Sequence, residues 1–356
     1  MTSEPVTSAP TPPIDPSMRR GISVFMPILN EEKHLEEAVT AILAQRYDGP
    51  VEVVLAIGPC TDRTWDVARA LAERDERITL VENPTGRTPD GLNAALAATH
   101  HDVLVRVDGH GILSPGYFAT VERLLRETGA ANVGGIMDAE GTTPFEEAVE
   151  CAMKSKIGVG GVKFKQGGEA GPVESVYLGN FAREWIEKVG MYDPRYTRAQ
   201  DWELNFRIRK GGGTVWFTPD LRVTYRPRAT LKALAKQYFE YGTWRRVVAR
   251  QHKGSINLRY LAPPVAVAGV VAGSLIGLKW RPALAAPLGY AALVTAGGVR
   301  AASGRSPQVI VRMPFVLATM HMAWGTGFMT SNVELEPADQ AKRREPDGTP
   351  RMCSLG

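Results

Sequence analysis

The chain has 356 residues, of which 44% are hydrophobic and 22% charged, which is typical of one large or two modest folded domains. Its net charge of +4 is too small to indicate a nucleic-acid partner, and we expect none. The three cysteines, Cys60, Cys151 and Cys353, have no paired spacing, which argues against a disulfide scaffold and indicates a reducing compartment.

The first 20 residues differ in composition from the rest. Residues 1–20 are rich in Pro, Ser and Thr and contain no apolar run, so we expect a disordered tail and not a secretory signal. From residue 21, short apolar runs alternate with segments of helical periodicity. Asn30 is placed to cap the first helix, and Ser114 with Pro115 to begin a later one. The expected strands cover 22–28, 51–57, 78–82 and 102–107.

Strands that alternate with helices of 10–15 residues predict βαβ units and an α/β fold with a mostly parallel, Rossmann-like sheet. The apolar runs are continuous, as expected for strands buried on both faces. Ligands of such sheets bind beyond the carboxyl ends of the strands. The segments at that edge read "PILNEE", "GPCTDRT", "NPTGRTPDG" and "DGHG".

This predicted edge is unusually acidic. Acids together with a histidine could hold a divalent metal that binds a diphosphate, and a separate carboxylate could act as a general base. Taken alone, "DGH" could equally be a turn, and Asp201 could be an ordinary helix N-cap. The residues concerned are Glu31, Asp62, Asp108, His110 and Asp201.

Six separated motifs agree in order with a known family: "PILNEE", "CTDRT", "TPDGLNAAL", "VDGH", "YLGNF" and "QDWELNFRIRKGG". Together they resemble the family 2 glycosyltransferases with a GT-A fold, in a membrane-associated subgroup similar to succinoglycan-synthesis glucosyltransferases. The resemblance implies a GT-A domain over residues 21–230. It also implies transfer of a sugar from a nucleotide diphosphate to an acceptor, with inversion at the anomeric carbon.

The resemblance also implies roles for single residues. "VDGH" stands where the family has its D-x-D metal motif, and "QDWEL" stands where it has the aspartate that acts as base, which is Asp201 here. The family's usual acids after the second strand are replaced by Ile57 and Gly58, and the acid before the base by Gln200. The residues expected to bind the nucleotide-sugar are Pro27, Glu31, Asp62, Asn93 and Asp108.

Asp108 and His110 are the expected metal ligands. A nitrogen ligand suits Mn²⁺ better than Mg²⁺, so we expect a preference for Mn²⁺. By resemblance, Gly179 and Asn180 would shape the acceptor site, and Trp202 could stack on a sugar or lie in the core. A UDP-sugar is the default donor of the family, and a GDP-sugar stays open.

The last third of the chain changes character. Residues 231–258 combine aromatic and basic side chains and predict an amphipathic helix on an anionic membrane surface. Residues 259–332 hold three nearly uncharged stretches, at 260–278, 282–299 and 313–332, each close to the length of a membrane span. We expect two to three apolar helices, since three spans would put the basic segment "KRRE" outside. Residues 333–356 are expected to be a polar tail.

These patterns favour an inverting, metal-dependent glycosyltransferase at the cell's inner (plasma) membrane. Its catalytic domain would be cytoplasmic, its acceptor lipid-linked or close to the membrane, and its product a cell-envelope or exopolysaccharide glycan. One alternative is a polyprenyl-phosphate sugar synthase, and another is a non-catalytic sugar-nucleotide-binding assembly protein. A nucleotidyltransferase is disfavoured, because "NEEKHL" is not the glycine- and arginine-rich loop that it would need.

Overall fold

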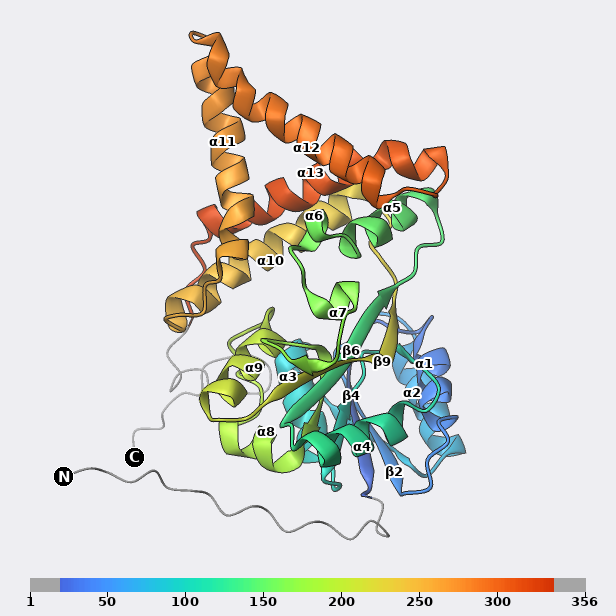
Figure 1. The fold of residues 1–356 in the computed structure, drawn as a ribbon. Coiled ribbons are helices and arrows are strands. Elements are labelled where there is room, and N and C mark those ends of the chain that lie inside the picture. The colour runs from blue at the N-terminus through green and yellow to red at the C-terminus, as the bar shows by residue number, and fades with distance from the viewer. Residues whose placement is uncertain (1–19, 336–356) are drawn as a thin grey trace, which may run out of the picture.

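The computed structural model of the protein describes residues 20–335, so the tails expected at 1–20 and 333–356 lie almost entirely outside the described residues. The described chain forms one nine-stranded sheet with the order β3-β2-β1-β4-β8-β6-β9-β5, and β7 pairs with β9 (Figure 1). The strands are β1 (Ile22–Ile28), β2 (Val51–Ile57), β3 (Ile78–Glu82), β4 (Val103–Arg106), β5 (Ile112–Leu113), β6 (Asn132–Ala139), β7 (Gly171–Pro172), β8 (Tyr177–Ala182) and β9 (Val215–Tyr225).

The first half of the sheet is parallel, as predicted. Strand β1 pairs in parallel with β2 and β4, and β2 pairs in parallel with β3. Helices pack on both faces of the sheet, and two hydrophobic clusters fill the two interfaces. One face carries α1 (Leu35–Leu43), α2 (Thr64–Arg74) and α4 (Tyr117–Thr128), and the other carries α3 (Thr88–Ala97), α8 (Arg183–Val189) and α9 (Gln200–Lys210).

The second half of the sheet is mixed. Strand β8 runs antiparallel to both β4 and β6, and β9 is parallel to β6. The α5–α7 segment, with α5 (Pro144–Met153), α6 (Lys156–Val159) and α7 (Lys163–Gln166), returns the chain into the sheet in the opposite sense. The repeated strand–helix pattern of the sequence does not reveal this reversal.

Two predicted helix starts are wrong by a few residues. Helix α1 begins at Leu35, and Asn30 lies in the preceding turn with a φ of +56°. The side-chain oxygen of Asn30 accepts from the backbone N–H of Thr61 at 2.8 Å, so it joins two loops and does not cap a helix. Helix α4 begins at Tyr117, after the left-handed Gly116, two residues later than Pro115 predicted.

A second helical layer covers the end of the domain and contains α5, α10 (Leu231–Gln251) and α13 (Pro307–Thr330) (Figure 1). Helices α10 and α13 cross closely, because a Cβ on Gly242 would lie 2.0 Å from the carbonyl oxygen of Trp324. A Cβ on Gly327 would likewise lie 2.2 Å from the carbonyl oxygen of Phe239. Small residues at a crossing allow this approach. Apolar packing against α13 therefore holds α10 in place.

This packing involves α10, the helical part of the segment 231–258 predicted to lie at a membrane surface, and that position stays a prediction. Val247 and Val248 of α10 are buried, and the basic side chain of Arg245 is only 6% exposed. The helix is therefore a scaffold element whose basic residues are in part internal. The third apolar stretch, at 313–332, forms most of α13, where Met313, Leu317 and other side chains are fully buried in the same layer.

The other two apolar stretches form a helical hairpin that projects from the body, with α11 (Ala262–Gly277) and α12 (Ala285–Ala301) as its arms (Figure 1). Short 3-10 turns, η1 (Leu258–Leu261) and η2 (Arg281–Leu284), precede the two arms. Segments Leu258–Gly277 and Arg281–Ala301 are long and apolar enough to cross a membrane, and only 11% of each is buried in the protein. The outer surface of the hairpin is therefore almost entirely apolar and uncovered.

Candidate functional site

The acidic residues predicted from separate strand ends do gather at one edge of the sheet. Asp108 follows β4, Glu31 follows β1, and Asp201 lies in the first turn of α9. Arg106, the last residue of β4, joins two of these carboxylates. Its guanidinium lies 3.0 Å from Oδ1 of Asp108, and it makes a second, short ion pair with Oδ1 of Asp201.

Arg106 is a buried cation, since only 3% of its surface is exposed. Its ring neighbour is Tyr192, whose centre lies 5.8 Å from the guanidinium carbon. Burial acts to lower the pKa of Arg106, but the charges of Asp108 and Asp201 outweigh it and raise the pKa well above its usual range. Arg106 therefore stays charged and holds the two carboxylates on either side of it.

Asp201 is the second residue of α9, and its side chain is 29% exposed. Burial raises its pKa to about 6, and the neighbouring Asp108 charge acts in the same direction, while Arg106 acts against them. A carboxyl group with a pKa near neutrality exchanges protons more readily than an ordinary aspartate. The carboxylate of Asp201 is therefore held at a partly exposed position beside a buried cation, with a pKa of about 6.

His110 and Glu31 form a second pair at this edge. Nδ1 of His110 lies 2.8 Å from Oε1 of Glu31. The hydrogen bond with Glu31 raises the pKa of His110, and burial opposes it. The backbone N–H of Glu31 donates to the hydroxyl oxygen of Thr64 at 2.7 Å, which fixes the loop after β1 to the start of α2.

A metal ion at this edge would depend on two protein ligands. Within residues 20–335, no group of three or more His, Cys, Asp or Glu side chains is arranged to hold an ion. The contact of His110 Nδ1 with Glu31 leaves Nε2 for a metal, an arrangement common among metal-binding histidines. Both contacts from Arg106 go to Oδ1 of Asp108, which leaves Oδ2. One nitrogen and one oxygen ligand would suit a divalent ion that also binds the diphosphate of a donor, whose charge the ion would neutralise.

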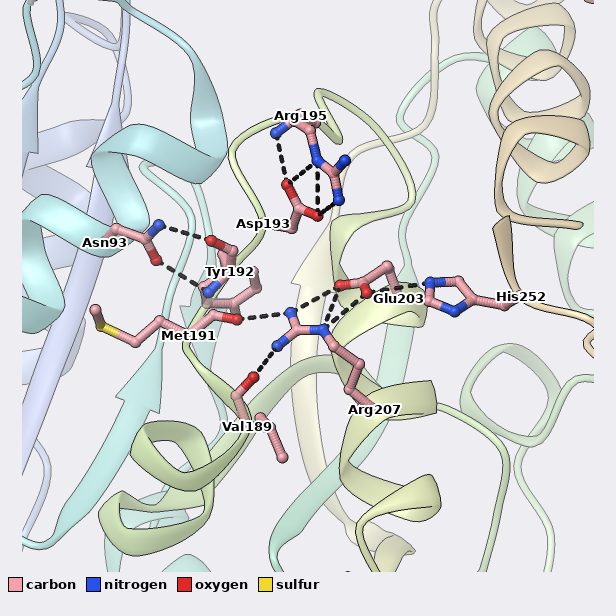
Figure 2. Close-up of polar contacts among 9 residues, drawn as sticks. All are labelled: Asn93, Val189, Met191, Tyr192, Asp193, Arg195, Glu203, Arg207 and His252. Carbon is pink, nitrogen blue, oxygen red and sulfur yellow. Dashed lines mark hydrogen bonds and ion pairs between the residues drawn. The ribbon is translucent and has the colours of Figure 1, made fainter. Parts of the chain in front are cut away.

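The loop that leads into α9 is tied down at several points (Figure 2). The side chain of Asn93, on α3, bonds to both backbone groups of Tyr192, at 2.7 and 3.0 Å. Arg207, on α9, donates to the carbonyl oxygens of Val189 and Met191. These contacts fix the segment before Asp201 and therefore the position of its carboxylate.

Glu203 anchors α9 to the helical layer. It is 2% exposed, and its carboxylate lies 2.7 Å from Arg207 and 3.2 Å from Nε2 of His252 (Figure 2). Burial acts to raise the pKa of Glu203, but hydrogen bonds with His252 and Arg207 outweigh it and lower the pKa. Because His252 follows the end of α10, this contact connects the helix that carries Asp201 with the second layer.

Two residues predicted to bind the nucleotide-sugar have structural partners instead. Both amide groups of Asn93 are used by Tyr192, as described above. Asp62 accepts hydrogen bonds from Thr64 and from the backbone of Glu32, so it orders the loop after β2. Pro27 is half-buried within β1. The structure thus brings together Glu31, Asp108, His110 and Asp201, and ties Asn93 and Asp62 to loops.

The three residues predicted to shape the acceptor site have packing or hydrogen-bond contacts within the protein. Asn180 is fully buried, where its amide donates to Tyr117 and to a backbone oxygen, so it has no exposed atom for an acceptor. Gly179 lies within β8 with a φ of +81°, and a Cβ there would lie 2.6 Å from the ring of Phe181, so the strand requires glycine at this position. The ring of Trp202 is already stacked with Phe206 and Arg245, which gives it a packing role rather than a free face for a sugar.

Comparison with known proteins gives the same picture. Residues 19–240 match the protein family described as "Glycosyltransferase like family 2". The succinoglycan biosynthesis protein ExoA of Rhizobium meliloti is 32% identical over 312 residues, which are 86% of this chain and 93% of that protein. The chain belongs to the family 2 glycosyltransferases.

Other relatives of this glycosyltransferase are more distant. A Methanococcus voltae enzyme, a dolichyl N-acetyl-alpha-D-glucosaminyl phosphate 3-beta-D-2,3-diacetamido-2,3-dideoxy-beta-D-glucuronosyltransferase, is 24% identical and matches over 68% of this chain and 77% of its own. The mannosyltransferase PcManGT of Pyrobaculum calidifontis, solved with GDP-Man and Mn²⁺, superposes with a TM-score of 0.60 at 21% identity over 89% of each chain. This superposition confirms the GT-A fold predicted from the motifs.

Proposed function

We propose that this glycosyltransferase inverts the anomeric centre as it moves a sugar from a nucleotide diphosphate to a lipid-linked or membrane-proximal acceptor. The role of the Rhizobium relative in succinoglycan biosynthesis supports a place in exopolysaccharide or cell-envelope glycan synthesis. A UDP-sugar is the proposed donor. A GDP-sugar is the second candidate, because the Pyrobaculum mannosyltransferase was solved with GDP-Man.

One observation carries the proposal: the Arg106 bridge between Asp108 and Asp201. The bridge keeps Asp108, in the D-x-D-like motif, and the proposed base Asp201 at the same edge of the sheet. A donor diphosphate near Asp108 and an acceptor hydroxyl near Asp201 would then lie on either side of the anomeric carbon. Electrostatic preorganisation of this kind is a major source of catalysis in group transfer.

In the proposed reaction, Asp201 accepts the proton of the acceptor hydroxyl while that oxygen bonds to the anomeric carbon. The bond from this carbon to the donor phosphate breaks on the opposite face, and the nucleoside diphosphate leaves with the bonding electrons. A divalent ion held by Asp108 and His110 would neutralise the charge of the leaving diphosphate. Glu31 would orient His110, and Arg207 and Asn93 would hold the loop before Asp201.

A donor screen tests the proposal. Full-length protein in detergent is incubated with UDP- and GDP-sugars, with and without a membrane lipid extract, and release of nucleoside diphosphate is followed. We expect release with one donor that increases when the lipid extract is added. If no donor is turned over under any condition, or if the product retains the donor's anomeric configuration, the proposed reaction is wrong.

Activity should fall on acidification through about pH 6, because burial raises the pKa of Asp201 to about that value. Only the deprotonated carboxylate can accept a proton, so kcat/KM should fall at least tenfold per pH unit below that value. A carboxyl ¹³C NMR titration, assigned by the signal missing in Asp201→Asn, measures the same group directly. A titration near the ordinary aspartate value would contradict this prediction.

Mn²⁺ should support activity better than Mg²⁺ at low concentration, because His110 offers nitrogen where Mg²⁺ prefers oxygen. His110→Asp should shift the preference toward Mg²⁺, while the control His100→Gln, which alters an exposed histidine, should keep that of the wild type. Rates are measured across a concentration series of each metal. Equal rates with low Mn²⁺ and low Mg²⁺ in the wild type would count against a histidine ligand.

We also propose that the hairpin of α11 and α12 crosses the inner membrane. Each arm with its 3-10 turn has 20 or 21 residues, and about 30 Å of helix matches the apolar core of a bilayer. Two crossings return the chain to its starting side, so the catalytic domain and the C-terminal tail would share the cytoplasm. With two spans the basic segment "KRRE" stays on the cytoplasmic side, whereas three spans would put it outside.

Cysteine labelling tests this topology, after Cys60, Cys151 and Cys353 are changed to Ser. In intact cells, a membrane-impermeant maleimide should label Trp280→Cys at the tip, while Ser303→Cys at the base should react only after lysis. The two positions are both exposed in the protein, so their difference reports the membrane. Protection of both, or labelling of both, would rule out a hairpin that crosses twice from the cytoplasm.

A further inference from the structure

A stack of alternating arginine and aromatic side chains lies between the catalytic domain and the base of the apolar hairpin. The guanidinium of Arg245, on α10, lies 3.7 Å from the ring centre of Trp202 and 3.8 Å from that of Tyr260. The guanidinium of Arg259 lies 4.8 Å from the ring centre of Tyr260. We call these four side chains the arginine stack. The reaction proposed above uses none of them.

The arginine stack has more hydrogen-bond donors than acceptors. Within residues 20–335, four of its buried nitrogens have no hydrogen-bond partner: Nε1 of Trp202, Nε and Nη1 of Arg245, and Nε of Arg259. Buried polar groups in native proteins are nearly always hydrogen-bonded, and an unmade bond is costly. All four nitrogens can only donate, so the partner that would satisfy them is an acceptor.

The stack also has an excess of positive charge. Arg245 is 6% exposed, and no carboxylate in the described part of the chain forms an ion pair with it. Arg209 and Arg259 act on it as further cations, and the one acid among these arginines is Glu174, which lies 2.6 Å from Arg259. Buried charges are normally paired. Three guanidiniums and one carboxylate leave an excess of positive charge that an anion would neutralise.

The position of the stack connects the proposed base with the hairpin. Trp202 follows Asp201 directly in the first turn of α9. At the other end, Arg259 and Tyr260 belong to η1, which continues into α11. Figure 1 shows the root of α11 beside the end of α10, next to the domain that contains α9. An anion bound here would therefore lie between the carboxylate that activates the acceptor and the apolar surface that faces lipid.

We propose that the arginine stack binds the phosphate or diphosphate group of a lipid-linked acceptor. Several phosphate oxygens would accept from the free nitrogens of Arg245, Arg259 and Trp202, and guanidinium groups match phosphate geometry well. The lipid chain would leave along α11, and the sugar attached to the phosphate would lie toward α9. The inference rests on the proposed function, for which it names the acceptor class.

Binding of defined probes to the full-length protein in detergent, with no donor present, tests the inference. The probes are a polyprenyl diphosphate, the matching uncharged polyprenol, inorganic diphosphate, and phosphatidylglycerol, each measured by titration. We expect the polyprenyl diphosphate to bind at least about tenfold more tightly than the other three, since hydrogen bonds to charged groups carry that much. Equal affinities for polyprenol and for polyprenyl diphosphate would mean that the stack does not bind the phosphate groups, and would overturn the inference.

Two further outcomes distinguish the source of the anion. If inorganic diphosphate bound as tightly as the lipid diphosphate, the site would serve a free anion and the lipid assignment would fail. If phosphatidylglycerol bound equally well, the arginines would serve general attachment to an anionic surface, and the acceptor assignment would again fail.

Variants connect the binding to the stack. Arg259→Gln and Trp202→Phe each remove free donors but keep most of the packing, and each should weaken binding of the polyprenyl diphosphate. Arg245→Gln should weaken it at least about tenfold. Arg123→Gln removes an exposed arginine on α4 that pairs with Glu127, and should bind as the wild type does. Unchanged binding by both Arg259→Gln and Trp202→Phe would overturn the inference even if Arg245→Gln failed to fold.

The experiment separates this inference from the proposed function. A wild-type protein that binds the polyprenyl diphosphate but turns over no donor would refute the transfer reaction and leave the phosphate site intact. A protein that transfers sugar but binds polyprenol and its diphosphate with equal affinity would refute the phosphate site and leave the transfer reaction intact. Where both hold, the variants should raise the acceptor KM and leave donor affinity unchanged, because the stack contacts no residue assigned to the donor.

Discussion

Replacement of Asp201 by asparagine should lower the rate of sugar transfer by about 10²–10⁴-fold, the range that a general base contributes. The amide is nearly isosteric but cannot accept the proton of an acceptor hydroxyl. Donor affinity should change little, because the proposed metal ligands Asp108 and His110 stay in place. Release of nucleoside diphosphate measures the rate, and calorimetric titration with the donor measures the affinity.

The matched control is Asp220→Asn, which changes an exposed aspartate in β9 and should keep the wild-type rate. A small effect of Asp201→Asn would have a definite meaning. A phosphate acceptor is already ionised and needs less help from a base, so a modest loss would favour the synthesis of a polyprenyl-phosphate sugar. Full activity in Asp201→Asn would exclude Asp201 as the base in either reaction.

Replacement of Arg106 by methionine should be the most destabilising of these changes. It removes a buried cation that is 3% exposed and leaves Asp108 and Asp201 close together without compensation. Breaking a buried ion pair in this way costs roughly 3–5 kcal/mol of unfolding free energy. Because Asp201 is partly exposed, we expect the lower end of that range at neutral pH. Denaturant unfolding of the full-length protein in detergent, followed by tryptophan fluorescence, measures the loss.

The pH dependence of this loss has a predictable sign. Without Arg106, burial and the charge of Asp108 both raise the pKa of Asp201, so the folded variant takes up a proton more readily than the unfolded chain. The stability difference from wild type should therefore shrink as the pH falls from 8 toward about 5. The double variant Arg106→Met with Asp201→Asn should lose less than the sum of the single changes. Additive losses at all pH values would show that the three side chains do not interact.

Arg123→Met provides the comparison for Arg106→Met, because it removes an exposed arginine of the same size. Its partner Glu127 lies on the surface, where such pairs contribute about 0–1 kcal/mol. A second comparison is Arg106→Lys, which keeps the charge but not the planar fork that reaches two carboxylates at once. We expect it to fall between wild type and Arg106→Met in both stability and activity.

The predictable part of the fold is the part that depends on local patterns. Apolar runs rich in β-branched residues gave the bounds of β1, β2 and β3, and the inner strands β1 and β2 are largely buried on both faces, whereas the edge strand β3 is not. The acidic edge followed, since parallel strands end on the same side. The mixed half of the sheet did not follow, because whether β8 pairs in parallel depends on where α5–α7 return the chain.

Site residues were predictable where the side chain follows a strand directly and less so elsewhere. Asp108 and His110 come just after β4, and their location is as expected. Asn93 and Asn180 lie in suitable motifs, but their amides turn to the backbone of a distant loop and to the core. Side-chain direction in such places is decided by tertiary contacts that no local pattern contains.

Arg106 was missed although the sequence carries its signal. It is the one charge in the apolar run 103–107, and a charge inside a buried strand requires a partner of opposite sign. The distance of 95 residues to Asp201 hides which partner it takes. The same holds for Arg245, which looks like part of a basic membrane-facing run and is instead enclosed between two rings.

The contact of Glu203 with His252 has a mechanical consequence. Asp201 and Glu203 are two residues apart on the rigid first turn of α9, and no flexible segment separates the proposed base from the point where α9 is fastened to the second layer. A movement of the second layer at His252 would therefore reach the first turn of α9 directly and change the position of Asp201. Should the hairpin cross the membrane as proposed, its tilt in a thinner or thicker bilayer would pass through α13 and α10 to α9 and move the Asp201 carboxylate, so turnover would vary with lipid chain length while donor affinity stayed constant.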